Sequence, residues 1–153
     1  MAHYSTALIV PTPPDQVFDR LSRFDRAEEW DPGVREGTML TPAPVALGSR
    51  FRLVARFLGR DVPLEYEVVE LTPGRRIAVR AETEAVVSHD VLTFVPGSDG
   101  TVLVYDARLE PKGLLRLFAP VVALAFRHIG DRAAAGLRAW LTCLLYTSPS
   151  PRD

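Results

Sequence analysis

The chain has 153 residues, the size of one domain with a single hydrophobic core. Its 47% hydrophobic and 24% charged residues are ordinary for a globular protein, and the net charge of −1 gives no basic surface for nucleic acid. The N-terminus lacks the basic region and apolar run of a secretory signal, and no stretch of about 18 consecutive apolar residues occurs. We therefore expect a cytoplasmic protein with no transmembrane segment.

The N-terminal region predicts one strand followed by two short helices. The alternating run YSTALIV, ended by proline, indicates a strand over residues 3–10. Thr12 can cap the next helix and two prolines suit its first turn, so we predict a helix over residues 13–24. Its apolar face consists of Val17, Leu21 and Phe24. A second short helix, RAEEW, ends before the turn sequence DPG.

A long region of β structure follows. Apolar residues alternate with arginines in SRFRLVARFLG and with glutamates in VPLEYEVVEL. The arginines of one strand and the glutamates of the next can therefore pair on the outer face. Further strands are predicted in VREGTML, RRIAVRAETEA, VVSHDVLTFV and TVLVYDARLE, and the hairpin turn PGSDG joins the last two. Short turns between consecutive strands predict an antiparallel sheet.

The segment GLLRLFAPVVALAFRHIGDRAAAGLRAWL has the periodicity of a helix, which Pro120 is expected to begin or kink. Its apolar stripe consists of Val122, Phe126, Ile129, Ala133, Leu137 and Trp140. A sheet with one apolar face and an amphipathic helix must bury these surfaces together. The sequence therefore predicts an α+β helix-grip fold: a curved antiparallel sheet of about seven strands around a long C-terminal helix, with two short helices after the first strand.

The last residues, Cys143–Asp153, differ in composition from the rest of the chain. One lysine against seventeen arginines, with no asparagine, indicates a GC-rich genome. A back-translation of residues 143–153, in contrast, resembles the transposase end and adapter used to prepare DNA libraries. We therefore predict one domain over residues 1–142 and a non-native tail over 143–153, with a natural Pro-Ser tail as the alternative. Without Cys143 the chain has no cysteine, so no disulfide or thiolate chemistry is expected.

Three segments of the sequence resemble the START-like (SRPBCC) superfamily. They are FDRAEEWDPGV, GSRFRLVARFLGRDVPLEYEVVELTPGRRI and FVPGSDGTVLVYDARLE. The resemblance runs from Tyr4 to Leu141 and is strongest to bacterial polyketide cyclase/dehydrase and lipid-transport-type proteins. It implies a helix-grip fold with a largely apolar cavity between the sheet and the C-terminal helix. Members bind lipids, hormones or hydrophobic metabolites, or cyclise and dehydrate polyketides, so the fold does not decide among these functions.

No pattern in the sequence predicts a metal or cofactor site. Histidine, cysteine and carboxylate residues do not cluster at metal-ligand spacing, and there is no glycine loop for phosphate. His3, His89 and His128 are scattered, and we interpret His128 as a packing or boundary residue of the helix. Ser88, His89 and Asp90 do not form a triad, because adjacent strand residues point to opposite faces. We therefore expect no metal and no cofactor.

Asp90 and Tyr105 are weak candidates for catalytic groups. Tyr105 shares a strand face with Leu103 and Leu109, which indicates that its hydroxyl points inward, either to a ligand or to a local partner in the core. Asp90 shares a face with Phe94. A carboxylate facing an apolar cavity would have a raised pKa and could act as an acid or base. The simpler interpretation is that Asp90 lies in water at the frayed start of its strand.

The predicted cavity lies between large residues of the sheet and a helix stripe that is partly small. The small helix residues are Ala125, Ala133 and Gly136. The residues predicted to bind a ligand are Tyr66, Tyr105, Phe57, Phe94, Leu103, Phe126, Ile129 and Trp30. Core packing without ligand contact is the alternative for Tyr66 and Trp30.

These observations favour a protein that binds or carries a hydrophobic small molecule, a lipid or a polyketide-like compound. The alternative is a cofactor-independent polyketide cyclase/dehydratase, which is less favoured because no pair of titratable residues clearly converges on the cavity. The run GLLRLFAPVVALAF, with one arginine, raises a third possibility, a membrane-surface or protein-interaction module. Its simpler interpretation is core packing at the start of the helix. The sequence contains no indication of the oligomeric state.

Overall fold

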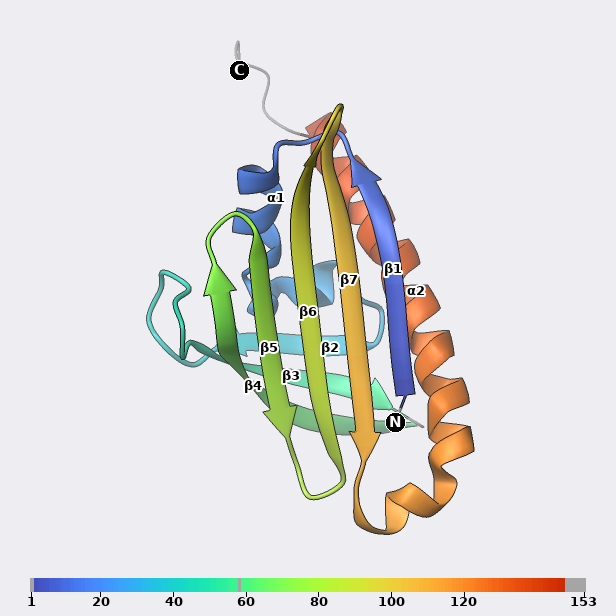
Figure 1. The fold of residues 1–153 in the computed structure, drawn as a ribbon. Helices are drawn as coiled ribbons and strands as arrows, with labels where there is room; N and C mark the ends of the chain where they lie inside the picture. The colour runs from blue at the N-terminus through green and yellow to red at the C-terminus, as the bar shows by residue number, and fades with distance from the viewer. Residues whose placement is uncertain (1, 58, 148–153) are drawn as a thin grey trace.

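The computed structural model describes residues 2–57 and 59–147, with side chains up to Leu141 (Figure 1). Within these residues a curled antiparallel sheet wraps around the long C-terminal helix α2 (Ala119–Thr147). The helix α1 (Pro14–Leu21) and the 3-10 helix η1 (Phe24–Glu29) follow the first strand. The predicted α+β helix-grip fold is therefore confirmed.

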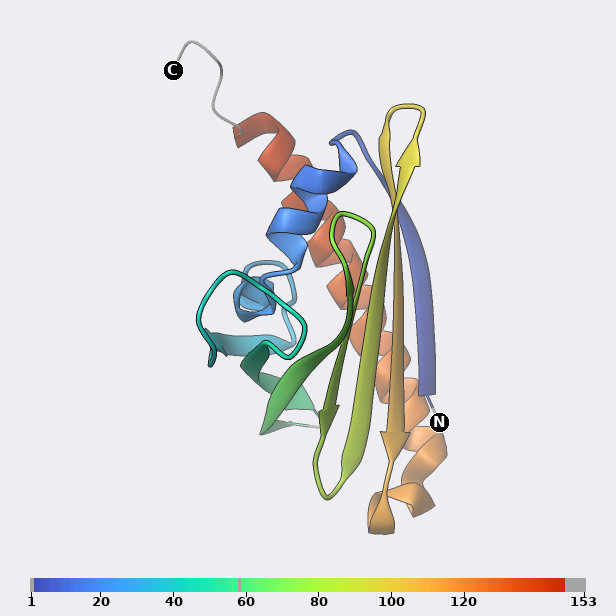
Figure 2. The same ribbon diagram turned by 60° about the vertical axis from the view of Figure 1, so that its left-hand side comes forward.

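The sheet is a meander whose first strand returns to its far edge. Its strands are β1 (Ala2–Val10), β2 (Val34–Met39), β3 (Arg50–Phe57), β4 (Arg60–Thr72), β5 (Arg76–Glu82), β6 (Val86–Gly97) and β7 (Gly100–Pro111). They lie in the order β1-β7-β6-β5-β4-β3-β2. In Figures 1 and 2, β2 and β3 run nearly across the direction of β6 and β7, so the sheet forms a trough. A register shift between Val68 and Glu70 of β4 adds to this curvature, as β-bulges do.

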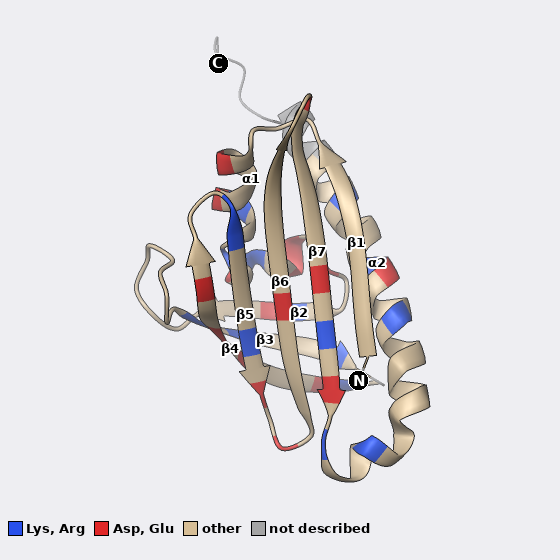
Figure 3. Cartoon of the chain, viewed as in Figure 1, with Lys and Arg blue, Asp and Glu red and all other residues tan. Residues whose placement is uncertain are grey.

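Charged residues recur along the strands, as Figure 3 shows. In β3, β4 and β5 they alternate with buried residues and are exposed, so they lie on the outer face of the sheet. The predicted pairing between β3 and β4 occurs at Arg50 and Glu65, whose side chains approach to 3.8 Å. Arg52 instead approaches Glu36 of β2, at 3.5 Å. These side chains are about half exposed, so each pair contributes little to stability.

One end of the inner face is closed by α1. Phe18 of α1 contacts Phe94 of β6 edge to face, with ring centroids 5.3 Å apart. Val17 and Phe94 are each 1% exposed and Leu103 is fully buried. The helix is shorter than the predicted residues 13–24, because it ends at Leu21 and Phe24 begins η1. This end of the sheet is therefore solid core.

The C-terminal helix approaches the rest of the molecule closely at two glycines. A Cβ atom on Gly136 would lie 1.9 Å from the carbonyl oxygen of Trp30, and one on Gly130 would lie 2.6 Å from the ring of Tyr4. Pro120 lies in the first turn of α2, so it begins the helix. These contacts hold one face of α2 against β1 and against the turn after η1.

The start of α2 and the preceding 3-10 helix η2 (Gly113–Phe118) expose a patch of large apolar side chains. The exposed apolar patch consists of Leu114, Leu117, Phe118, Val121 and Leu124, which are 55–81% exposed. The expected core packing of this segment is therefore wrong for these five residues, although Val122 between them is fully buried. Leu115, which lines the cavity, and the buried Val122 turn inward, whereas the opposite side of η2 and of the first turns of α2 is exposed.

The segment Gly113–Leu141 is apolar and long enough to cross a membrane, judged by length and composition alone. In this structure it supplies the helix around which the sheet curls. The backbone of α2 continues to Thr147 and so includes residues 143–147 of the predicted tail. Residues 148–153 of that tail lie outside the described part of the chain.

Candidate functional site

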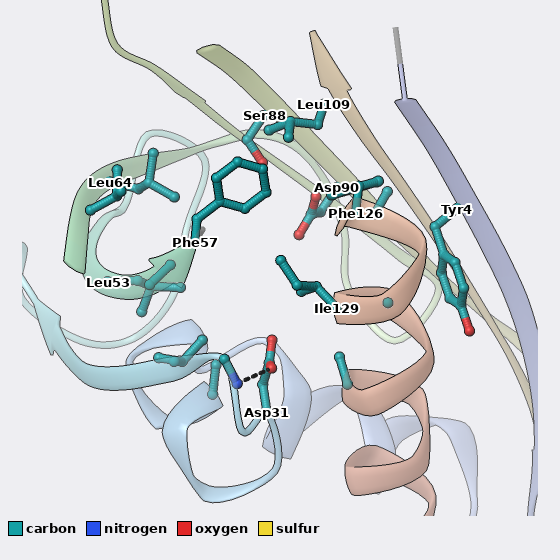
Figure 4. Close-up of a pocket in the computed structure, with 18 of the residues that line it drawn as sticks. Tyr4, Asp31, Leu53, Phe57, Leu64, Ser88, Asp90, Leu109, Phe126 and Ile129 are labelled. Atoms are coloured by element: carbon teal, nitrogen blue, oxygen red, sulfur yellow. Dashed lines mark hydrogen bonds between the residues drawn. The ribbon is translucent and has the colours of Figure 1, made fainter. Parts of the chain in front are cut away.

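A cavity of about 330 Å³ occupies the end of the trough that α1 does not cover (Figure 4). Its walls come from the inner faces of β3, β4, β6 and β7, the turn after η1, and α2. Apolar side chains form most of the lining, among them Trp30, Leu53, Phe57, Leu64, Ala107, Leu109, Phe126, Ile129, Ala133 and Leu137. The curl of the sheet and the small residues of α2 leave this space open.

Six of the eight residues predicted to bind a ligand line this cavity: Trp30, Phe57, Tyr66, Tyr105, Phe126 and Ile129. Their contact with a ligand stays a prediction. Phe94 and Leu103 do not line the cavity, because Phe18 and the rest of α1 fill the space above them. Of the small helix residues, Ala133 lines the cavity, whereas Gly136 packs against Trp30 and Ala125 lies elsewhere.

Tyr66 combines the two roles considered for it. Its ring is 6% exposed and lies 6.2 Å from the ring of Phe24, so it belongs to the core. Tyr66 also lines the cavity, and its hydroxyl forms a 2.8 Å hydrogen bond with the Ser88 hydroxyl. Burial raises the pKa of Tyr66, with a further contribution from the nearby Asp90 carboxylate, so this hydroxyl stays protonated. The Tyr66 and Ser88 hydroxyls therefore give the cavity a neutral polar contact.

Asp90 and Tyr105 meet inside the cavity. The Tyr105 hydroxyl donates a 2.9 Å hydrogen bond to Asp90 Oδ2. The simpler interpretation of Asp90 is wrong: it lies within β6, paired with Val79 on one side and Ala107 on the other, and not at a frayed end. Strand periodicity predicts the inward direction of its side chain, but it does not show that pairing on both sides holds this part of β6 in the sheet.

Burial makes Asp90 a weaker acid than an aspartate in water. It raises the pKa of the carboxyl to about 7, and the negative charges of Asp31 and Asp106 add to the effect. The hydrogen bond from Tyr105 lowers the pKa but does not cancel the cost of removing the carboxylate from water. Burial likewise raises the pKa of Tyr105, together with repulsion from Asp90. Near neutral pH, Asp90 can therefore gain or lose a proton while Tyr105 keeps its own.

Asp31 is a cavity residue that sequence reasoning missed. It belongs to the DPG turn, and Asp31 Oδ1 accepts a 2.8 Å hydrogen bond from the backbone N–H of Gly33. Figure 4 shows its carboxylate pointing into the cavity from the side opposite Asp90. Burial raises the pKa of Asp31, offset in part by the Gly33 N–H and the charge of Arg132. An aspartate before Pro-Gly usually signals only a turn, so no separate signal in the sequence indicates this role.

The histidines do not contribute to this site. His3 contacts Asp106 at 2.8 Å on the outer face, and His128 is exposed on α2. His89 alternates with Ser88 and Asp90 and so points to the other face of the sheet, which agrees with the absence of a triad expected from sequence. Within the described residues, no group of three histidine, cysteine or carboxylate side chains is placed to hold a metal ion.

A curled sheet that grips a long helix and leaves an apolar cavity at one end defines the class of helix-grip, START-like proteins. The chain belongs to the family described as polyketide cyclase / dehydrase and lipid transport, whose sequence model matches residues 1–142. This family implies binding of a hydrophobic ligand. None of the curated proteins matches the sequence.

Solved structures share the fold at low sequence identity. A START superfamily protein from Mycobacterium smegmatis is 18% identical with a TM-score of 0.78, over 94% of this chain and 99% of that one. The Zhui aromatase/cyclase from Streptomyces sp. R1128 is 16% identical with a TM-score of 0.76, over 97% and 98%. A protein from Thermus thermophilus is 18% identical with a TM-score of 0.74, over 93% and 97%. At these identities the similarity establishes the fold alone.

Proposed function

We propose that this protein binds, and can carry, a hydrophobic small molecule in the cavity at the open end of its sheet. The observation that carries the proposal is a cavity of about 330 Å³ with mostly apolar walls, within the size range of small-molecule sites. Burial of apolar ligand surface, at about 25 cal/mol per Å², supplies the driving force. Lipids and polyketide-like compounds are the ligand classes that agree with the family.

The polar groups of the cavity fix the orientation of such a ligand. Tyr105 is hydrogen-bonded to Asp90 on one wall of the cavity. Figure 4 shows Phe57, Phe126 and Ile129 around the space in front of Asp90. A ligand with an apolar body and few polar atoms can therefore place its polar end at Tyr105 and its apolar part among these side chains.

The proposal is tested by titration calorimetry with two ligands of nearly equal shape, 2-naphthylmethanol and 2-methylnaphthalene. Both should bind, and neither affinity should depend strongly on salt, because the interactions are apolar or shielded. Tyr105→Phe should weaken binding of the alcohol by about 0.5–1.5 kcal/mol, the scale of one neutral hydrogen bond, and spare the hydrocarbon. Absence of binding, or a steep loss with salt for both ligands, would contradict an apolar ligand site.

A second candidate function is a cofactor-independent cyclase or dehydratase, and the Asp90–Tyr105 pair favours it. A carboxyl group with a pKa of about 7 inside an apolar cavity is suited to proton transfer at neutral pH. Ionised Asp90 can take a proton from a carbon between two carbonyl groups, leaving the electron pair as an enolate. The enolate carbon then forms a bond to a second carbonyl carbon, and the proton on Asp90 passes to the new alkoxide. Atoms and charge balance without a cofactor.

Turnover of a short poly-β-ketone, followed by absorbance and mass spectrometry, distinguishes this enzyme from a carrier. An enzyme should convert the compound at a rate that Asp90→Asn reduces at least about 100-fold, the usual minimum for a general base. The control, Asp106→Asn, changes a carboxylate on the outer face that contacts His3 and Arg108. A carrier should bind the compound and return it unchanged, and the purified protein should contain a hydrophobic molecule.

The exposed apolar patch favours an additional role, contact with an anionic lipid surface. Between Pro111 and Gly130 the chain carries Lys112, Arg116 and Arg127 but no acidic residue. No charged residue lies between Arg116 and Arg127, and Figure 3 shows the corresponding turns at the start of α2 in tan. A helical surface with exposed leucine and phenylalanine and basic neighbours is suited to the boundary of an anionic membrane. Leu115 and Phe126 of the same segment line the cavity, so the patch and the cavity share one structural element.

Sedimentation with vesicles of phosphatidylglycerol and phosphatidylcholine tests this contact. Leu117→Glu should abolish sedimentation of the protein with the vesicles, because the substitution places a negative charge among the exposed apolar side chains. Val95→Glu is the matched control, since Val95 is 43% exposed on β6, outside the patch. Equal sedimentation of both variants and the parent protein would contradict a role for the patch.

A further inference from the structure

The polar groups of the cavity are unusual in their charge. Two carboxylates, Asp31 and Asp90, face the same space from opposite walls (Figure 4). They are close enough that the charge of Asp31 raises the pKa values of Asp90, Tyr66 and Tyr105. Asp90 is half-buried, and it lines the cavity with the surface that it still exposes. A cavity with mostly apolar walls thus contains two acids.

Each carboxylate has one oxygen held by the protein and one left for a ligand. Asp90 Oδ2 accepts the Tyr105 hydroxyl, and Asp31 Oδ1 accepts the Gly33 N–H. Within the described residues no side chain or backbone group donates a hydrogen bond to Asp90 Oδ1 or Asp31 Oδ2. These two carboxylate oxygens are therefore available to accept hydrogen bonds from a ligand in the cavity.

The described residues place no cation among these acids. The basic residues that line the cavity, Arg56 and Arg60, are exposed on β3 and β4, and Arg56 lies 3.8 Å from Asp61. The charge of Arg132, on the exposed side of α2, lowers the pKa of Asp31, but the two side chains do not form an ion pair. The face of α2 toward the cavity is apolar, with Phe126, Ile129 and Ala133. A carboxylate that is partly removed from water and has no cationic partner is costly, so a ligand that supplies a cation at this place is favoured.

We infer that the ligand of this cavity carries a basic nitrogen on an apolar body, and that its ammonium group binds between Asp31 and Asp90. An ammonium group has three donors and no acceptor, which matches two carboxylate oxygens without donors. The aromatic rings of Trp30 and Tyr105, whose centroids are 6.1 Å apart, add surfaces that attract a cation. This inference rests on the proposed binding function and adds the chemical class of the ligand. Fatty-acid anions are disfavoured at the same place because their charge repels both acids.

A dependence on pH follows from the groups around Asp90. Asp90 has a pKa of about 7, and the groups that face it or act on it are Asp31, Tyr66, Tyr105 and, from the outer face, Asp106. Both tyrosines keep their protons in this range, so among these three groups Asp90 is the one whose charge changes near neutral pH. Below this pH the bound ammonium must displace a proton from Asp90. Amine affinity should therefore rise by about tenfold between pH 6 and pH 8, where the amine itself stays charged.

Titration calorimetry with 2-naphthylmethylamine, 2-naphthylmethanol and 2-naphthoate tests the inference, because these compounds share one apolar body. At pH 8 the amine should bind at least about tenfold more tightly than the alcohol, the scale of a charge-assisted hydrogen bond, and the naphthoate most weakly. Lower pH should weaken the amine and release protons on binding, which titrations in two buffers of different ionisation enthalpy measure.

Asparagine variants assign the effect to the two acids. Asp90→Asn keeps the shape of the side chain and should remove the preference for the amine and its rise with pH, while alcohol affinity changes less than about threefold. Asp31→Asn should reduce the preference. Asp106→Asn, on the outer face, should keep the preference at pH 8 and only move its rise to slightly lower pH, because the charge of Asp106 contributes to the raised pKa of Asp90. Alcohol binding by each variant also shows that it is folded.

The outcomes separate this inference from the proposal on which it rests. If the alcohol binds and the amine gains no preference at pH 8, or keeps it in both Asp90→Asn and Asp31→Asn, the inference is wrong and the hydrophobic site stands. If none of the three compounds binds, both are wrong.

Discussion

The two ends of the sheet's inner face differ although the same strands build both. On β6, Phe94 is part of a solid core while Asp90 borders a cavity, and both point to the same side. On β7 the same holds for Leu103 and Tyr105. The difference comes from what lies opposite: α1 places Phe18 on Phe94, whereas small residues of α2 and a turn face Asp90. Strand periodicity determines the face of a residue, and the opposing element determines whether that face is core or site.

The largest expected effect contrasts the two ends by alanine substitution. Phe94→Ala should lower the free energy of unfolding by about 3–5 kcal/mol, because it leaves a void in a packed region. Phe126→Ala should lower the free energy of unfolding by only about 1–2 kcal/mol, since Phe126 already borders the cavity. The same substitution should allow larger ligands to bind. Urea unfolding of both variants measures the difference. Equal costs would mean that the two ends are packed alike.

The acid at the open end should make stability depend on pH. Asp90 has a pKa of about 7 in the folded protein and about 3.9 in the unfolded chain, so the folded state binds the proton more tightly. The contribution of this proton to the free energy of unfolding is complete below about pH 4 and is lost as the pH rises to about 7. Asp90→Asn lacks this loss. The variant should gain about 2 kcal/mol relative to the parent between pH 4 and pH 8, a value reduced from the full shift because the cavity admits water. If the parent protein and Asp90→Asn show the same pH dependence of the free energy of unfolding, the pKa of Asp90 is not raised.

The contact between α2 and the turn that carries Asp31 should be sensitive to one added methyl group. Gly136→Ala brings a Cβ atom to 1.9 Å from the Trp30 carbonyl oxygen, so α2 or the turn must move. We expect a net loss of about 1–2 kcal/mol, because steric strain exceeds the gain in helix propensity. The melting temperature gives this value. Ala139→Gly, on an exposed position of the same helix, is a control for propensity alone. A stabilised Gly136→Ala protein would show that α2 does not approach the turn so closely.

The smallest expected effect concerns the C-terminal segment. The last buried side chain described on α2 is Leu141, next to the packed end. Truncation after Thr142 should change the free energy of unfolding by less than about 0.5 kcal/mol and leave ligand affinity unchanged, if residues 143–153 are a non-native tail. A drop of several degrees in melting temperature would instead mean that the segment packs on the domain.

The sequence was sufficient to predict the fold because its periodicities are strong. The alternation in β3 and β4 and the stripe on α2 each have one solution that buries their apolar faces. The inward direction of Tyr105 and Asp90 follows from the same alternation. Phe94 was misplaced because nothing in β6 reveals that Phe18 lies over it. These are distant contacts, which local pattern does not encode.

Asp31 and the exposed apolar patch are two further features that local sequence pattern could not predict. Asp31 satisfies the requirement of a turn completely, so its place in the cavity wall appears only when the turn is seen across the cavity from β6. The apolar run at the start of α2 is typical of core by composition, whereas its exposure depends on how far the trough extends along the helix.

The most direct test of the difference between the two ends is the location of a bound ligand by nuclear Overhauser effects. In the complex with 2-naphthylmethanol, the aromatic protons of the ligand should show contacts to the methyl groups of Ala107, Leu109 and Ile129, which line the cavity. They should show none to Leu92 or Leu103, which are fully buried at the packed end. Contacts to Leu92 and Leu103, or only to Leu117 on the exposed apolar patch, would contradict a binding site at the open end of the sheet.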